Sequence, residues 1–201
     1  MGGAVTQEAW RLALTTCDEI LRQIDQQWDD LLRVKSAFPT MNKELIGQRK
    51  INTAPFYKQH GYPVSISFPK PLTPEMIEAL NQISMWLNES YVIRLCALLE
   101  YSKIIPQEGK SQIDQSIEGH EAVDILRRLR NKLLHRSGRY NPKDRESRLL
   151  YERIVNTFSL DAESPNEATR FPLPINTFLL PLTKKCNSYV VVWFAKYRTS
   201  P

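Results

Sequence analysis

The stretch HEAVDILRRLRNKLLHRSGRY, residues 120–140, decides the fold. Its apolar residues recur at steps of four and three, at Ala122, Leu126, Leu129 and Leu133. An α-helix turns about 100° per residue, so these side chains share one stripe. The spacing predicts a single amphipathic helix that buries this stripe, with Gly138 as its stop signal.

Arg130 lies inside the apolar arc of this predicted helix, about 40° from Leu126. A guanidinium keeps its charge, so burying it is costly unless a carboxylate or phosphate pairs with it. Glu100, on the preceding predicted helix, is the candidate carboxylate, although a Glu more often faces solvent. The competing reading, which helix geometry alone favours, is that the Arg130 stem covers the core while its head reaches water.

Asn131 and His135 are four residues apart and therefore share a helix face. Together with Arg130 they read R-N-x-x-x-H. Arg130 and His135 are about 140° apart on an ideal helix, so one helix does not easily present both to a small ligand. A second helix, or a second copy of this one, would complete such a site.

The run Arg130-Asn131-Lys132-Leu133-Leu134-His135 resembles the R-x4-6-H signature of the HEPN superfamily. The resemblance extends over about residues 74–160. It implies a small all-α bundle that commonly dimerises, with the motifs of two subunits meeting at the interface. Many members are metal-independent ribonucleases of toxin–antitoxin and defence systems, and others are non-catalytic RNA-binding or adaptor modules.

This resemblance implies a catalytic set of Arg130, Asn131 and His135. His135 would act as general base or acid, because an imidazole titrates near neutral pH. Arg130 would stabilise charge on the phosphate, and Asn131 would orient the phosphate or the histidine. Transesterification needs both a base and an acid, so the single motif histidine again points to two subunits.

Positive charge is concentrated around the motif. Residues 121–148 hold nine Lys or Arg against four acids, and the excess of +5 equals the net charge of the whole chain. This concentration favours an RNA path over a merely solvated face. The predicted RNA contacts are Arg127, Lys132, Arg136 and Arg139.

Outside the motif, apolar periodicity predicts a helix over residues 6–36, another from 74 to about 105, and a last one from Leu182. A polar connector precedes the motif helix. After the motif, Asn141 and Pro142 predict the cap and first residue of a further helix. The expected fold is an all-α, HEPN-like bundle of about five helices in a single domain over residues 1–201. Its parts are the first helix, an irregular insertion over 37–73, a motif-bearing core over 74–160, and a C-terminal loop and helix over 161–201.

Prolines and loss of the helical period mark the insertion, where residues 64–68 alternate and are compatible with a short strand. Its basic residues interleave with Phe56, Tyr57 and Tyr62. That mixture suits single-stranded nucleic acid, but a proline-pinned cover over the bundle is slightly favoured.

The remaining composition restricts the class of protein. Three scattered cysteines and the absence of a Cys/His cluster predict neither a disulfide framework nor a zinc site. We expect no metal and no cofactor. The N-terminus lacks the pattern of a signal peptide, and no apolar run reaches membrane-spanning length, so the expected location is cytoplasmic without membrane contact.

The leading hypothesis is therefore a metal-independent endoribonuclease that cleaves RNA through its 2′-hydroxyl, works as a homodimer, and serves as a toxin or defence effector with an antitoxin or other protein partner. The competing hypothesis is a non-catalytic HEPN-like module that binds RNA, a nucleotide or a protein. A third is a helical interaction domain with a chance motif. RNA turnover separates the first hypothesis from the others.

Overall fold

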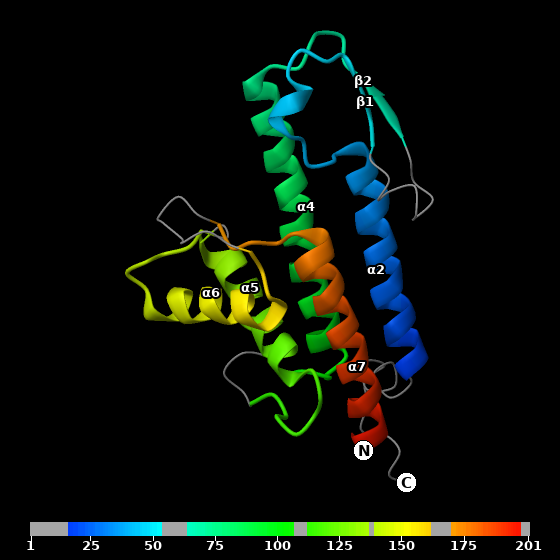
Figure 1. Ribbon diagram of the computed structural model, residues 1–201. Helices are drawn as coiled ribbons and strands as arrows, with labels where there is room; N and C mark the ends of the chain where they lie inside the picture. The colour runs from blue at the N-terminus through cyan, green and yellow to red at the C-terminus, as the bar shows by residue number, and fades with distance from the viewer. Residues whose placement is uncertain (1–15, 54–63, 107–111, 137–138, 162–169, 198–201) are drawn as a thin grey trace, which may run out of the picture. The chain divides into compact units, whose positions relative to one another are not determined.

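Helices make up most of the computed structural model, which describes residues 16–53, 64–106, 112–136, 139–161 and 170–197 (Figure 1). Within these ranges the only sheet is a pair of short strands. The predicted all-α class is confirmed. The α-helices are α2 (Cys17–Ala37), α4 (Pro74–Tyr101), α5 (His120–Arg136), α6 (Arg145–Phe158) and α7 (Leu180–Tyr197). None of these described helices is long and apolar enough to cross a membrane.

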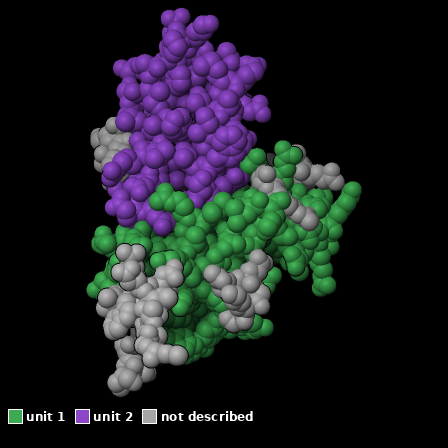
Figure 2. Space-filling model, turned by 180° about the vertical axis from the view of Figure 1, so that it is seen from behind, with its two compact units in different colours: residues 1–25, 92–201 green, residues 26–91 purple. Residues whose placement is uncertain are grey.

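The chain divides into two compact units (Figure 2). Unit 1 comprises residues 1–25 and 92–201, and unit 2 comprises residues 26–91. The boundaries fall inside α2 and α4, so each of these helices contributes to both units. The expectation of a single domain over 1–201 stays a prediction.

The core of unit 1 forms around α5, which packs against both α6 and α7. The predicted stripe of α5 is buried, and Val123 and Ile125 beside it are fully buried as well. Because two helices cover α5, its buried face is wider than the stripe in the sequence. Cys96 and Cys186 are also fully buried, and burial raises the pKa of Cys96 to about 12.

Gly119, immediately before α5, fixes how the chain approaches α7. Its φ of +87° is strained for residues other than glycine. A Cβ atom at this position would lie 2.8 Å from the backbone oxygen of Lys185, which is on α7. The position therefore requires glycine for both conformation and space.

The helix α5 ends at Arg136, and the predicted stop signal, Gly138, lies with Ser137 outside the described residues. Tyr140 is buried and packs edge-on against Tyr151, with ring centroids 5.4 Å apart. The chain therefore leaves the helix before an aromatic contact that anchors it to α6.

The predicted start of the next helix at Asn141 and Pro142 is wrong. The helix α6 begins at Arg145, and Asp144 is its N-cap, with Oδ1 accepting a 3.1 Å hydrogen bond from the Glu146 amide. Asn141 Oδ1 instead accepts a 3.0 Å bond from the Lys143 amide. This local turn at Asn141 delays the helix until Asp144 can cap it.

In unit 2 the strands β1 (Lys50–Asn52) and β2 (Ser65–Ser67) pair antiparallel, with Ile51 opposite Ile66. The strand expected within residues 64–68 is thus confirmed. Ile51 belongs to a small core with Met41, Leu72 and Ile77. The aromatic residues predicted to serve nucleic acid, Phe56, Tyr57 and Tyr62, lie outside the described residues.

Lys35 near the end of α2 is fully buried in unit 2. Its Nζ donates to the Ser84 carbonyl oxygen at 3.2 Å and to the Ser84 hydroxyl, and Thr40 Oγ1 lies at 3.5 Å. None of these acceptors carries a charge. Burial without a carboxylate partner lowers the pKa of Lys35 to about 8.

The last helix, expected from Leu182, begins at Leu180 and is continuous with a π-helical turn, η2 (Ile175–Leu179). The valine run 190–192 lies inside this helix, and Val190 is fully buried. For the first helix, the structure confirms the helix from Cys17 onward, and the predicted residues 6–15 lie outside the described part.

Candidate functional site

Arg130 is held from two sides on α5. Its Nη2 donates to Glu100 Oε2 on α4, and its Nη1 donates to Asn131 Oδ1 at 2.8 Å. The side chains of Arg130 and Glu100 are 22% and 9% exposed. The carboxylate named from the sequence therefore does pair with Arg130, and the arginine head is not simply hydrated.

Glu100 has an unusual environment for a carboxylate. Its Oε1 atom is buried and has no hydrogen-bond partner among the described residues. A buried carboxylate oxygen without a donor is costly, so Glu100 depends on Arg130 for its charge compensation. The nearby Cys96 has its pKa raised mainly by burial and also by the charge of Glu100. The Glu100–Arg130 pair thus lies at the edge of the apolar core.

His135 lies five residues after Arg130 and is exposed. The neighbouring Leu134 is 54% exposed, which is unusual for a large apolar side chain near the end of a packed helix. The side chain of His135 makes no hydrogen bond or ion pair within the described part of the chain. The structure therefore brings together Arg130, Asn131 and Glu100, but it does not bring His135 to them.

Lys132, predicted to contact RNA, forms ion pairs with two carboxylates of the protein. Its Nζ donates to Asp144 Oδ2 at 2.7 Å and lies 3.5 Å from Glu146 Oε2. The hydrogen bond from Lys132 is the main reason why the pKa of Asp144 falls to about 2. Since Asp144 also caps α6, Lys132 ties the end of α5 to the start of the next helix.

The other predicted RNA contacts have different environments. Arg139 is exposed, and its backbone forms an isolated antiparallel bridge with Arg170. The side chain of Arg136 lies outside the described residues. Arg127 is largely buried and pairs with Asp124 at 3.2 Å. Of these predicted contacts, Arg139 is the one that the structure describes as exposed.

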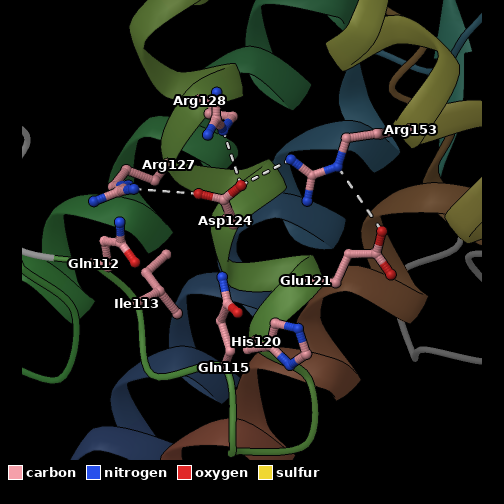
Figure 3. A pocket seen from close by; sticks show the side chains of 9 residues that line it. All are labelled: Gln112, Ile113, Gln115, His120, Glu121, Asp124, Arg127, Arg128 and Arg153. Atoms are coloured by element: carbon pink, nitrogen blue, oxygen red, sulfur yellow. Dashed lines mark hydrogen bonds and ion pairs between the residues drawn. The ribbon is translucent and has the colours of Figure 1, made fainter.

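Arg127 belongs to a cluster that lines a hollow of about 520 Å³ beside the first turns of α5 (Figure 3). Asp124 is the centre of this cluster. Its Oδ2 accepts 2.8 Å hydrogen bonds from Arg128 and from Arg153 on α6, while its Oδ1 faces Arg127. Burial raises the pKa of Asp124, but the bonds from Arg153 and Arg128 outweigh burial and the net pKa is lowered.

His120 lines the same hollow. Its Nδ1 is 3.0 Å from the carbonyl oxygen of Ile117. A carbonyl only accepts, so Nδ1 donates and Nε2 is left for another partner. The i, i+3 and i, i+4 spacing of Asp124 with Arg127 and Arg128 was visible in the sequence. The approach of Arg153 to Asp124 depends on tertiary packing and was not visible in the sequence.

No group of three metal-ligating side chains gathers within the described ranges. Comparisons with protein-family models, with curated proteins and with solved structures find no match to this chain. What can be stated of its class is therefore an all-α fold with a paired arginine on its central helix and an arginine-lined hollow.

Proposed function

We propose that this chain is a metal-independent endoribonuclease of HEPN type that acts as a homodimer. The observation that supports this best is the anchoring of Arg130 by Glu100 and Asn131. A guanidinium fixed on part of its fork, with 22% of the side chain still exposed, is suited to bind a phosphate without first losing side-chain entropy.

The proposed reaction needs only RNA and protein groups. A histidine base removes the proton of the 2′-hydroxyl, and the resulting oxygen attacks the adjacent phosphorus. The bond to the 5′-oxygen breaks, and a protonated histidine supplies the proton to that leaving oxygen. The products are a 2′,3′-cyclic phosphate and a free 5′-hydroxyl. Arg130 stabilises the extra negative charge on the phosphate oxygens, and Asn131 orients Arg130.

The proposal places His135 of one subunit near Arg130 of the other. Helix geometry separates these two residues by about 140° within one chain. The exposed Leu134 beside His135 would be covered in such a dimer. A composite site also supplies two histidines, one as base and one as acid.

A non-catalytic module that binds RNA, a nucleotide or a protein is the second candidate. The pairing of Lys132 with Asp144 inside the protein favours it. In this reading the motif residues mainly stabilise the fold. Such a module would bind RNA or a nucleotide without turnover. A helical domain with a chance motif would instead show an altered melting temperature, but no altered ligand affinity, when Arg130 is replaced by Ala.

The decisive experiment incubates cellular RNA with the purified protein in excess EDTA. We expect cleavage with cyclic-phosphate ends by the wild type, none by His135→Ala, and full cleavage by Arg145→Gln, a control on α6. A DNA strand of matched sequence should stay intact because it lacks the 2′-hydroxyl. Equal cleavage by the wild type and His135→Ala, or cleavage of DNA, would contradict the mechanism.

Mixing wild-type and His135→Ala subunits tests the composite site. Combined in equal amounts after dissociation, the subunits form dimers of which about half are mixed and about a quarter are fully wild type. Because a mixed dimer holds only one of the two histidines, we expect about a quarter of the activity of the same amount of wild-type protein. About half of that activity, or a sedimentation mass of one chain at micromolar concentration, would count against a site shared between subunits.

A further inference from the structure

The hollow beside the start of α5 carries an excess of positive charge. Three guanidiniums line it, from Arg127, Arg128 and Arg153, and two carboxylates oppose them, from Asp124 and Glu121. The second carboxylate is a weak partner, because Glu121 is 52% exposed and 3.8 Å from Arg153. The hollow therefore keeps a local charge of about +1 with its own acids in place.

Two of these arginines have donors to spare. Arg128 bonds Asp124 only through Nε, and neither of its Nη atoms has a partner among the described residues. Arg153 bonds Asp124 through Nη1 alone. A guanidinium carries five N–H donors in a planar fork that matches the oxygens of a phosphate. The unused edges of both side chains are thus available to an anion.

Asp124 holds these two guanidiniums in place before any ligand arrives. Its carboxylate is only 18% exposed and accepts from both Arg128 and Arg153 at 2.8 Å. A shared anchor of this kind removes rotamer freedom from long side chains, which reduces the entropy cost of binding. Figure 3 shows the three arginines around Asp124. The cluster is organised for recognition as well as for stability.

The rest of the wall suits a ligand larger than an ion. The hollow of about 520 Å³ falls within the range of small-molecule sites. Ile113, which is 6% exposed, adds a small apolar area, and His120, with Nδ1 occupied by Ile117, offers Nε2. An apolar surface beside a cationic group is suited to a molecule that carries a phosphate on an organic body.

We propose that this hollow binds the phosphate of a nucleotide, with Arg128 and Arg153 as its main donors. The nucleotide is either a free mononucleotide or part of an RNA strand, since both present the same phosphate chemistry. The proposal is separate from RNA cleavage, because it needs neither Arg130 nor His135. About 22 Å of helix axis separates His120 from His135.

The test measures binding by calorimetry, with AMP, adenosine and a short 5′-phosphorylated RNA as probes. We expect AMP to bind, and adenosine to bind at least tenfold more weakly. Arg128→Gln and Arg153→Gln should each weaken AMP binding about tenfold or more, because each removes a charge-assisted bond. Arg128→Lys should give a partial loss, since it keeps the charge and loses the fork. Arg145→Gln removes one charge from the same helix as Arg153 and should bind like the wild type.

The two sources of phosphate give different results. Tight binding of AMP identifies a free nucleotide, whereas binding of the RNA alone, weakened by Arg128→Gln, identifies a strand. His135→Ala should leave the affinities for AMP and for the RNA unchanged. If the protein binds AMP but does not cleave RNA, the proposed ribonuclease activity is overturned and the proposed nucleotide site is not. The proposal is overturned if neither AMP nor the RNA binds. It is also overturned if folded Arg128→Gln and Arg153→Gln bind AMP or the RNA as tightly as Arg145→Gln does.

Discussion

Glu100 and Arg130 are 30 residues apart and join α4 to α5 through an ion pair in which Arg130 Nη2 donates to Glu100 Oε2. The pair is asymmetric. Arg130 has a second acceptor in Asn131, whereas Glu100 Oε1 has no donor among the described residues. Removing Arg130 therefore leaves Glu100 uncompensated, whereas removing Glu100 leaves Arg130 with Asn131. This difference can be measured as a difference in the free energy of unfolding.

A double-mutant cycle on this pair should give a clear coupling. We expect Arg130→Met to lower the free energy of unfolding by about 2 kcal/mol, because it leaves a nearly buried carboxylate without compensation. Glu100→Gln should cost less, since Arg130 remains 22% exposed and keeps Asn131. The double variant should be more stable than the sum of the two losses predicts, by about 1 kcal/mol in urea unfolding. Additive losses would show that the pair contributes no coupling.

Lys35 should make stability rise at alkaline pH. Its folded pKa of about 8 is below the ordinary value of 10.5. Between these values the unfolded chain holds a proton that the folded chain has released. Unfolding then takes up a proton, and folding becomes more favourable as the pH rises.

The matched variant for this prediction is Lys35→Met, which keeps the volume and removes the titration. Relative to this variant, the wild type should gain about 3 kcal/mol of unfolding free energy from pH 8 to pH 10.5. Below pH 8 the difference between the two proteins should be constant. Parallel stability curves across the alkaline range would refute the assignment.

Asp144 should give a pH dependence of the same sign, but in acid. Lys132 lowers its pKa to about 2 from the ordinary 3.8, so its carboxylate stabilises the folded state above about pH 4. This stabilisation is lost as the pH falls from about 4 to 2, because the unfolded chain binds the proton first. Asp144→Asn retains a side-chain oxygen for the cap and should show a flatter acid profile in thermal unfolding. An unchanged acid profile in Asp144→Asn would contradict the role of the ion pair.

Two glycines form a natural comparison. Gly47 and Gly119 have φ values of +84° and +87°, but only Gly119 faces a neighbour, the Lys185 oxygen. Gly47→Ala should cost about 1 kcal/mol, the backbone penalty alone. Gly119→Ala should cost at least about 1 kcal/mol more, because its Cβ would lie 2.8 Å from a backbone atom. Equal losses in chemical denaturation would mean that α7 can shift without cost.

The helical periodicity predicted the fold class and placed Arg130 on the apolar face with Glu100 as a candidate partner, although a hydrated arginine head was the favoured reading. Burial of a charge on an apolar stripe demands a partner, and the structure supplies it. The same reasoning applies to Lys35, which lies four residues after the buried Leu31. Its partners Thr40 and Ser84 are uncharged, and no sequence rule selects a hydroxyl 49 residues away. The position was predictable, and its partners were not.

Local signals were ambiguous where two of them competed. Asn141-Pro142 and Asp144 both mark a helix start, and the turn at Asn141 leaves the cap to Asp144. The approach of Arg153 to Asp124 results from packing of α6 on α5, which depends on contacts between segments 29 residues apart. The relation of His135 to a second subunit is not decided by one chain's sequence.

All three thiols of the protein belong to unit 1, since residues 26–91 contain no cysteine. Cys96 and Cys186 are inaccessible in the folded state, while Cys17 is partly accessible. The rate of alkylation of the two buried thiols therefore reports the opening free energy of unit 1 alone. Amide hydrogen exchange in the β1–β2 ladder reports the opening free energy of unit 2. Equal opening free energies would mark one cooperative molecule, and unequal ones would show that the helices α2 and α4 cross a border between separately melting halves.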